Sequence, residues 1–354
     1  MSELLPPQPV RTRRQHGAVR IEDVARAAGV SAITVSRALN KPDSVAEETR
    51  KLVWAAVDEL GYIPNRLAGG LASSRTRTVA VVIPTITNSI FADKIQGMSD
   101  VFGAADYQLI LANSGYSLGR EADLVAALLA QRPSAIVLTG VTHEERAARM
   151  LGRAGVPVVE TWNLRPSPID MLVGFSNAEA AFAMVAHLHH CGYRRIGFVS
   201  APVADNDRAA DRLAGYRRAV AEFDLADRPG LAREAHFTLA NGAAAFREIL
   251  SAHPDVEAIF FANDVLAAGG ALEARRRGMR IPADIGIAGF DDVDLAQEFV
   301  PALTTVRIPR YEIGATAARM ILARLDDPET DAPPVADLGF EVVQRQSTRP
   351  APSP

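Results

Sequence analysis

The segment from Ile21 to Asn40 reads IEDVARAAGVSAITVSRALN, and the spacing of its small and apolar residues is typical of a helix-turn-helix. Two helices can cross closely only where a small side chain lies at the crossing, and the turn between them favours a residue that tolerates positive φ. Ala25 and Gly29 meet these two needs, and Val35 supplies an apolar residue for the inner face of the second helix. Ser31 stands where it can cap that helix. The segment therefore predicts two short helices joined by a tight turn.

The helix-turn-helix is predicted to belong to a head of three helices, over residues 21–28, 32–39 and 45–60. Ser44 and Glu47 form an S-x-x-E pattern, which predicts a capping box at the start of the third helix. The second helix is short and exposes small side chains with one Arg and one Asn, which suits entry into the major groove of DNA. Its outward positions are Ala32, Ile33, Ser36, Arg37 and Asn40. The alternative is an ordinary three-helix subdomain.

Beyond residue 77 the chain alternates between short apolar runs and amphipathic stretches. Strands are predicted over residues 79–83, 107–111, 135–138, 156–159, 196–199, 258–261 and 285–290, with helices near 89–104, 119–131 and 144–154. This alternation is typical of βαβ units and parallel sheets. The stretch is too long for one small sheet, so two doubly wound lobes with a ligand cleft between them are expected. The predicted fold class is an all-α helix-turn-helix head followed by two α/β lobes.

Charge is distributed unevenly along the 354 residues, which carry a formal net charge of −4. Residues 1–77 hold 12 Lys and Arg against 8 Asp and Glu, whereas the remainder holds 26 against 34. A basic head on an acidic body suggests that the head meets a polyanion and that the body does not.

Several classes of protein are disfavoured by what the sequence lacks. A single cysteine, Cys191, cannot form an internal disulfide or a multi-thiolate metal site, and no metal or cofactor is expected. The apolar runs are far shorter than the roughly 18–20 residues that span a bilayer, and no apolar region follows the arginines near residue 11, so a cytoplasmic protein without a membrane partner is expected. No pairing of a nucleophile with a base is visible, so no catalytic residue is predicted and an enzyme is not expected.

Longer motifs in the head carry a family resemblance. Asp23-Val24-Ala25, Gly29-Val30-Ser31, the run from Thr34 to Asn40 and the run from Leu60 to Ala68 closely resemble the DNA-binding head of the lactose repressor (LacI) family. The resemblance extends from about residue 19 to 348. It implies a repressor that binds a pseudo-palindromic double-stranded operator as a homodimer, with a tetramer also open.

The resemblance also implies roles for individual residues of the head. Ala32, Ile33 and Arg37 would meet base edges, while Thr34, Ser36 and Asn40 would hold phosphates. The segment from Asn65 to Ser73 would form a hinge helix in the minor groove, with Leu71 as the wedge that opens the central base step. The implied DNA-binding set is completed by Tyr62, Asn65, Arg66 and Ala68.

The body of this family resembles periplasmic sugar-binding proteins, which have two lobes, three crossovers and a ligand in the cleft. The predicted crossovers are 174–177, 301–305 and 337–340. The predicted domains are a flexible basic arm (1–17), the head (18–64), a hinge (65–77), an effector-binding and dimerisation domain (78–349) and a tail (350–354). Within the effector-binding domain, the predicted N-lobe spans about 78–176 and 306–338, and the predicted C-lobe spans about 177–305 and 339–349.

Within the family, several segments of the body look most like the repressors of gluconate and 2-ketogluconate use. Two of them are Ile83-Pro84-Thr85-Ile86-Thr87-Asn88 and Phe261-Ala262-Asn263-Asp264. The resemblance implies the effector contacts Asn88, Phe91, Tyr116, Thr139, Glu160, Phe175, Arg208, Arg212, Asn263, Asp264, Asp291 and Arg310.

The three arginines of this set favour a sugar acid as the effector. A neutral sugar needs carboxylates, amides and a ring to stack on, whereas an acid also needs a cation, best a planar bidentate Arg. Arg208, Arg212 and Arg310 together supply more positive charge than a neutral hexose requires. The alternatives are surface salt bridges for some of these arginines, a neutral sugar, or a corepressor such as a purine that strengthens DNA binding. A sugar-binding transport protein is a further alternative from another class, but it leaves the head without a role.

Overall fold

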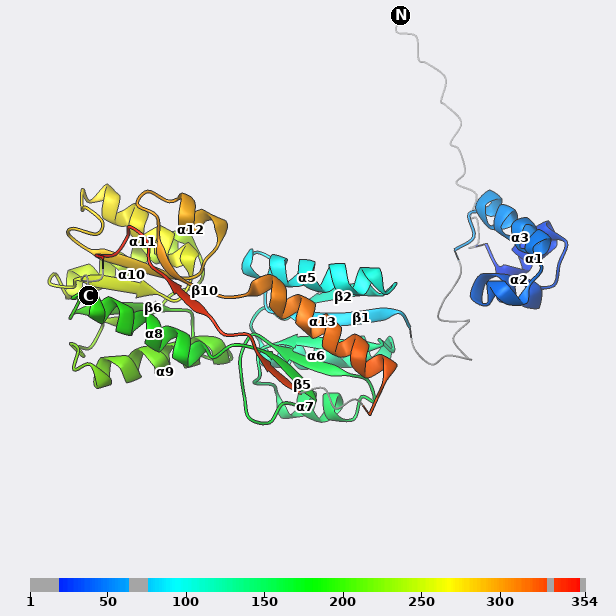
Figure 1. Ribbon diagram of the computed structural model, residues 1–354, viewed down its shortest axis with the longest axis horizontal. Coiled ribbons are helices and arrows are strands. Elements are labelled where there is room, and N and C mark those ends of the chain that lie inside the picture. The colour runs from blue at the N-terminus through cyan, green and yellow to red at the C-terminus, as the bar shows by residue number, and fades with distance from the viewer. Residues whose placement is uncertain (1–18, 64–75, 330–333, 351–354) are drawn as a thin grey trace, which may run out of the picture. The chain divides into compact units, whose positions relative to one another are not determined.

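The computed structural model describes residues 19–63, 76–329 and 334–350 (Figure 1). The chain divides into two compact units whose boundary falls between Thr76 and Arg77, and each unit has a hydrophobic core of its own. The predicted basic arm and four predicted DNA contacts, Asn65, Arg66, Ala68 and Leu71, lie outside the described residues.

The first unit has the predicted helix-turn-helix. It contains α1 (Ile21–Ala28), α2 (Ala32–Asn40), the short 3₁₀ helix η1 (Pro42–Ser44) and α3 (Glu47–Leu60). Val24, Val35 and Val53 are fully buried where the three helices meet. Gly29 has a φ of 67° in the turn, and the Ser31 hydroxyl accepts the backbone N–H of Thr34 at 3.1 Å. The helix-turn-helix interpretation is therefore confirmed.

The predicted capping box at Ser44 is wrong. Ser44 ends η1 and its hydroxyl donates to the carbonyl of Lys41 at 2.7 Å, while α3 begins after Ala46 without a side-chain cap. The hydroxyl serves the 3₁₀ turn that Pro42 opens, so it is not available to the amides of α3. At the start of α1, where Arg20 provides no side-chain cap, the carboxylate of Asp23 accepts the backbone N–H of Arg20 at 3.0 Å.

The second unit consists of two lobes, each built on a six-stranded sheet. The N-lobe sheet has the order β11-β5-β4-β3-β1-β2, and the C-lobe sheet has the order β12-β10-β9-β8-β6-β7. Every pairing is parallel except that of β10 with β12, which confirms the doubly wound α/β lobes. The strands are β1 (Thr78–Ile83), β2 (Gln108–Asn113), β3 (Ala135–Thr139), β4 (Val158–Thr161), β5 (Met171–Gly174), β6 (Ile196–Ser200), β7 (Ala232–Glu234), β8 (Ala258–Phe261), β9 (Gly286–Asp291), β10 (Thr304–Arg307), β11 (Val335–Asp337) and β12 (Glu341–Val343).

Helices cover both faces of each sheet (Figure 1). They are α5 (Ile90–Ala104), α6 (Leu118–Ala130), α7 (Glu145–Gly152), α8 (Asn177–His190), α9 (Asp207–Glu222), α10 (Leu239–Ala252), α11 (Asp264–Arg276), α12 (Asp294–Glu298) and α13 (Arg310–Asp326). Figure 1 shows α13 beside α5, although the two lie far apart in the sequence. Gly97 and Gly314 permit this packing, since a Cβ at either position would collide with the backbone of the other helix.

The chain crosses between the lobes three times, and the second crossing differs from the predicted one. It lies at Ile308 and Pro309, between β10 of the C-lobe sheet and α13 of the N-lobe, and not at residues 301–305. Thr304, Thr305 and Val306 are β-branched and fully buried, so they extend the sheet beside β9 and carry the C-lobe past residue 305.

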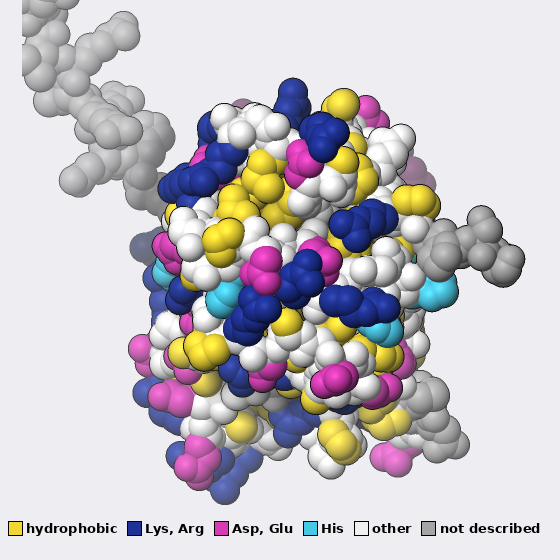
Figure 2. Space-filling model, turned by 90° about the vertical axis from the view of Figure 1, so that its left-hand side faces the viewer, with side chains coloured by type: hydrophobic (Ala, Val, Ile, Leu, Met, Phe, Trp, Pro, Cys, Tyr) yellow, Lys and Arg dark blue, Asp and Glu magenta, His cyan; other side chains and the backbone are white. Residues whose placement is uncertain are grey.

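The surface of the second unit mixes charges of both signs. Figure 2 shows basic and acidic side chains interspersed with apolar ones on the face that it presents. Ion pairs account for part of this mixture, such as Arg228 with Asp255 at 2.8 Å and Arg280 with Asp284 at 2.7 Å. Among the described residues, no helix is long and apolar enough to cross a membrane, and no group of three or more His, Cys, Asp or Glu could hold a metal ion.

Candidate nucleic-acid interface and effector site

The exposed face of α2 is the candidate nucleic-acid interface. Ile33 is 67% exposed and Arg37 is exposed one turn later on the same face. Ala32, Thr34 and Ser36 are half-buried, and the Thr34 hydroxyl lies 2.9 Å from that of Ser31. Asn40 is the last residue of α2. Tyr62 is half-buried against the core of the head, so its ring also stabilises the fold.

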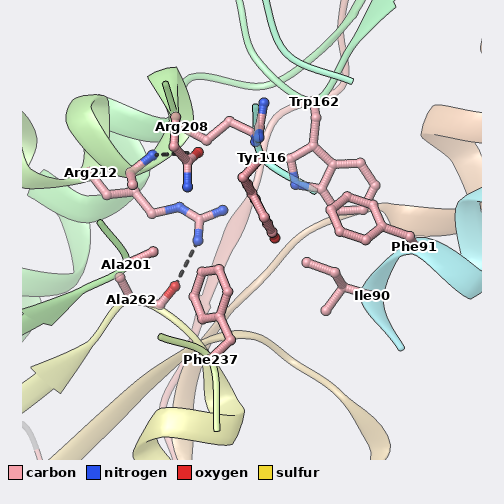
Figure 3. Close-up of a pocket in the computed structure, with 11 residues that line it drawn as sticks. Ile90, Phe91, Tyr116, Trp162, Ala201, Arg208, Arg212, Phe237 and Ala262 are labelled. Carbon is pink, nitrogen blue, oxygen red and sulfur yellow. Dashed lines mark hydrogen bonds between the residues drawn. The ribbon is translucent and has the colours of Figure 1, made fainter. Parts of the chain in front are cut away.

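A narrow pocket lies between the carboxyl ends of the strands of the two lobes (Figure 3). The N-lobe contributes aromatic and apolar side chains, and the C-lobe contributes the cations together with Phe237 and smaller side chains. The lining residues are Ile90, Phe91, Tyr116, Trp162, Ala201, Asn206, Arg208, Ala209, Arg212, Phe237 and Ala262. Four predicted effector contacts are therefore brought together, namely Phe91, Tyr116, Arg208 and Arg212.

Aromatic rings form one side of this pocket. The rings of Phe91 and Trp162 have centroids 5.1 Å apart, and those of Tyr116 and Phe237 are 6.3 Å apart across the two lobes. Tyr116 and Trp162 have φ values of 61° and 83°, which side chains other than glycine rarely adopt. Non-glycine residues held in such conformations cluster at functional sites. Trp162 and Phe237 were not predicted; the one available indication was that Trp162 lies three residues beyond the predicted strand 156–159, and the observed β4 extends to Thr161.

Two arginines of α9 also line the pocket (Figure 3). Arg208 is 8% exposed; its Nη1 donates to the carbonyl of Thr139 at 3.2 Å and to the carboxylate of Asp207 at 2.8 Å. Arg212 is 5% exposed; its Nε donates to Asn177 at 2.8 Å and its Nη1 donates to the carbonyl of Ala262 at 2.7 Å. Neither arginine is therefore held in a surface salt bridge.

Arg212 keeps its charge near neutral pH. Burial lowers the pKa of Arg212 to about 10, which still leaves the guanidinium protonated. The guanidinium of Arg212 lies 3.8 Å from the centroid of the Phe290 ring, and its Nη2 is 4.0 Å from Oδ1 of Asp291. Two cations that are nearly removed from water thus border one pocket.

The predicted acidic contacts lie next to Arg212 and not in the lining. Nδ2 of Asn263 donates to Asp291 at 2.5 Å, and Asp264 accepts the Thr305 hydroxyl at 2.7 Å and the backbone N–H of Val293 at 2.9 Å. Burial raises the pKa of Asp264 to about 8 and that of Asp291 to about 6. Oδ1 of Asp291 makes no hydrogen bond to any described residue, so it is open to a donor.

Four other predicted contacts are placed elsewhere. Nε of Arg310 donates to Asp93 at 2.7 Å and its Nη1 donates to the backbone carbonyl of Asp291, so it lines a separate hollow. Glu160 accepts the backbone N–H of Ile169 at 2.6 Å and pairs with Arg165 at 3.3 Å. Phe175 is fully buried against Phe290. The Thr139 hydroxyl donates to the carbonyl of Val82 at 3.1 Å, beneath the lining.

Asn88, the remaining predicted contact, lines a hollow next to the pocket. This hollow shares Tyr116 and Phe237 with the pocket. Nδ2 of Asn88 is buried and has no hydrogen-bond partner among the described residues. A buried amide donor of this kind is usually satisfied by a ligand or a water molecule.

Comparison with known proteins shows the family to which this architecture belongs. The model for "Bacterial regulatory proteins, lacI family" matches residues 20–65, and that for "Periplasmic binding protein-like domain" matches residues 185–348. The HTH-type transcriptional regulator GntR of Pseudomonas aeruginosa is 37% identical over 337 residues, which cover 95% of this chain and 97% of that protein.

Solved structures agree with these matches. A LacI-family transcriptional regulator from Silicibacter pomeroyi superposes with a TM-score of 0.87 at 35% identity, covering 93% of this chain and 99% of that one. The lac repressor dimer bound to operator and the anti-inducer ONPF gives a TM-score of 0.80 at 25% identity, covering 94% and 99%. This chain belongs to the LacI family of DNA-binding transcriptional repressors, in which a helix-turn-helix head is joined to a sugar-binding type of domain.

Proposed function

We propose that this repressor binds a pseudo-palindromic operator as a homodimer and leaves it when a sugar acid of the gluconate or 2-ketogluconate type occupies the pocket. The observation that carries the effector class is the pair of buried arginines, Arg208 and Arg212, that line the pocket. A buried guanidinium strongly favours a ligand carboxylate, because the low dielectric strengthens the ion pair and the planar group can bind both oxygens.

Polar groups beside the pocket suit a hydroxylated ligand. Oδ1 of Asp291 and Nδ2 of Asn88 are buried and lack hydrogen-bond partners among the described residues. A carboxylate oxygen and an amide are the groups that accept from and donate to sugar hydroxyls. The rings of Phe91 and Trp162 offer apolar faces for the carbon chain. A polyhydroxylated acid therefore matches the acceptor, the donor, the cations and the aromatic rings together.

The operator side of the proposal rests on the exposed face of α2. We assign Ile33, Arg37 and Ala32 to base edges, and Thr34, Ser36 and Asn40 to phosphates. A single head reads one half-site, so a symmetric operator requires two copies of the chain. The related lac repressor is described as a dimer on its operator, which supports a dimer here. We also assign Tyr62 and the segment from Asn65 to Leu71 to operator contacts.

A binding panel tests the effector class. Calorimetric titration of the full chain should show binding of gluconate or 2-ketogluconate, with glucose, sorbitol and purines bound more weakly by about tenfold or more. Binding of glucose or of a purine alone would refute a sugar acid. Fluorescence anisotropy with a promoter-derived palindrome then fixes the direction of the response: an inducer lowers operator affinity, whereas a corepressor raises it.

A further inference from the structure

Lys94 is a fully buried cation beneath the aromatic side of the pocket. It lies on α5, one turn after Phe91, and its side chain is 0% exposed. Its Nζ donates to the hydroxyl of Thr139 at 2.6 Å and to that of Thr161 at 3.2 Å, at the ends of β3 and β4. The two hydroxyls donate their own hydrogen bonds to the backbone carbonyls of Val82 and Leu138. Their oxygens are therefore the acceptors of the bonds from the lysine.

Lys94 differs from the other cations of the pocket because no described carboxylate pairs with it. Arg208 has Asp207 at 2.8 Å, and Arg212 has Asp291 at 4.0 Å. Around Lys94, the described partners are the two neutral hydroxyls and the rings of Phe91 and Trp162, whose centroids are each 5.7 Å from Nζ. A buried charge without a counter-charge is costly unless a partner neutralises it or the group loses its proton.

The position of Lys94 connects this missing counter-charge to the ligand. Phe91 and Trp162, which Nζ contacts, also line the pocket. Thr139 joins two cations, because its hydroxyl accepts from Lys94 while its backbone carbonyl accepts from Arg208. An anion in the pocket would therefore be separated from Lys94, a third cation after Arg208 and Arg212, only by the rings of Phe91 and Trp162.

We propose that Lys94 is a specificity-determining residue that makes the pocket select anions, and that it takes up a proton when the anion binds. The inference rests on the proposed function, since it assigns part of the acid preference of the same pocket to a residue that does not touch the ligand. The bound carboxylate supplies the counter-charge that the described protein groups do not. Lys94 is also suited to this role chemically, because the chain has 35 arginines and only three lysines, and only a lysine can lose its proton near neutral pH.

The electrostatics give the direction of the proton movement. Burial first, and Arg208 second, lower the pKa of Lys94 to about 7, so the free protein holds a mixture of neutral and charged lysine near neutrality. Arg208 on α9 is the charged group that acts on it; β3 and β4 present only threonine hydroxyls, and α13 packs Gly314 against its backbone. A nearby anion raises the pKa of an amine. Binding is therefore coupled to proton uptake at pH 7 to 8.5, and affinity falls as pH rises.

Titration calorimetry of the full chain with gluconate tests the proposal. Gluconate is ionised throughout this pH range, so it contributes no proton. Measurements in phosphate and in Tris, which differ in ionisation enthalpy, report the number of protons taken up. We expect uptake of a substantial fraction of a proton at about pH 8, and an affinity that falls roughly threefold or more between pH 7 and 8.5.

Three variants test whether Lys94 is the residue that takes up the proton. Lys94→Met removes the titrating group at similar length, so uptake should vanish and gluconate affinity at pH 7 should fall about tenfold. Lys94→Arg keeps the charge, so it should retain affinity without uptake. Asp264→Asn removes another buried group with a pKa near this range, about 8, and should leave the uptake in place.

The possible outcomes separate this inference from the proposed function. Gluconate binding by the unaltered chain without proton uptake overturns the role of Lys94 and leaves the sugar-acid repressor standing. Equal uptake by Lys94→Met does the same, because another group would then carry the proton. Binding of neutral sugars but of no sugar acid overturns both. Even where a variant fails to fold, gluconate binding without proton uptake by the unaltered chain overturns the role of Lys94.

Discussion

The head and the body of this repressor place their cations in opposite environments. Arg37 is exposed on α2, whereas Arg208 and Arg212 are more than nine-tenths buried beside the pocket. An exposed cation is screened by salt, and many of them must act together to hold a polyanion. A buried cation is screened little, and one or two suffice to select a small anion. The same residue type thus serves two different kinds of recognition, and the difference lies in burial.

Salt should separate the two units most strongly. Raising the salt concentration from about 50 to 200 mM should weaken operator binding about 1,000-fold, because neutralised phosphates regain their counterions. Gluconate binding should change by only a few fold over the same range, since its arginines are buried. Anisotropy and calorimetry at matched salt concentrations measure the two. Parallel losses would contradict the contrast between exposed and buried cations.

Arg212→Met should produce the next largest effect. The variant removes hydrogen bonds to Asn177 and Ala262 and leaves Asp291 without its cation, so gluconate affinity should fall about 100-fold. Arg218→Met is the matched control, because Arg218 lies on the same helix but pairs with Glu179 in an exposed salt bridge. Calorimetry should find little change in that control. Equal losses in the two variants would mean that the acid is bound elsewhere.

Arg37→Ala should affect only the head. Loss of a base-contacting arginine typically costs about 1 to 3 kcal/mol and relaxes the preference for the matching base pair. Arg26→Ala is the control, since Arg26 is exposed on α1 and pairs with Asp23 at 3.3 Å. Anisotropy with the operator and with single-base variants of it measures both quantities. A uniform loss over all sequences would reassign Arg37 to phosphate binding.

The smallest expected effect distinguishes two serines of the head. Ser31 caps α2, so Ser31→Ala should lower the stability of this helix by about 1 kcal/mol. Among the described residues, the hydroxyl of Ser44 bonds to the carbonyl of Lys41 on an exposed turn, so Ser44→Ala should cost about half of that or less. Hydrogen exchange of the amides of α2 and α3 in the full chain reports both. A larger loss of protection in α3 for Ser44→Ala than in α2 for Ser31→Ala would show that Ser44 caps α3 after all.

The sequence predicted the architecture well, because the patterns behind it are local. The interval between Ala25, Gly29 and Val35 depends on helix geometry and turn chemistry alone. The central strands of both sheets, such as β1, β3 and β8, are short apolar runs, and β1 is almost fully buried, as its composition predicts. Two local predictions failed. At Ser44, the carbonyl of Lys41 takes the hydroxyl that was expected to cap α3. At β10, pairing with β9 extends the strand to Arg307 and so moves the crossing between the lobes.

The pocket was predicted less completely, because its lining combines loops from both lobes. Trp162 and Phe237 lie on segments after β4 and β7, and the positive φ of Trp162 is not visible in residue spacing. Arg310 shows the opposite case: its type and position predicted a ligand contact, but its bonds to Asp93 and to the backbone carbonyl of Asp291 hold it in a separate hollow. Whether a cation is available to a ligand depends on such partners.

By itself, the sequence determined the helix-turn-helix, the alternation of strands and helices, the family and the opposite charges of head and body. Only the tertiary structure decided which cations are buried at the pocket. Lys94 illustrates the reason: on an amphipathic helix a lysine is expected at the surface, yet the sheet and α13 enclose it. Helix and strand patterns follow from neighbours along the chain, whereas burial and pairing of a charge follow from segments that folding brings together.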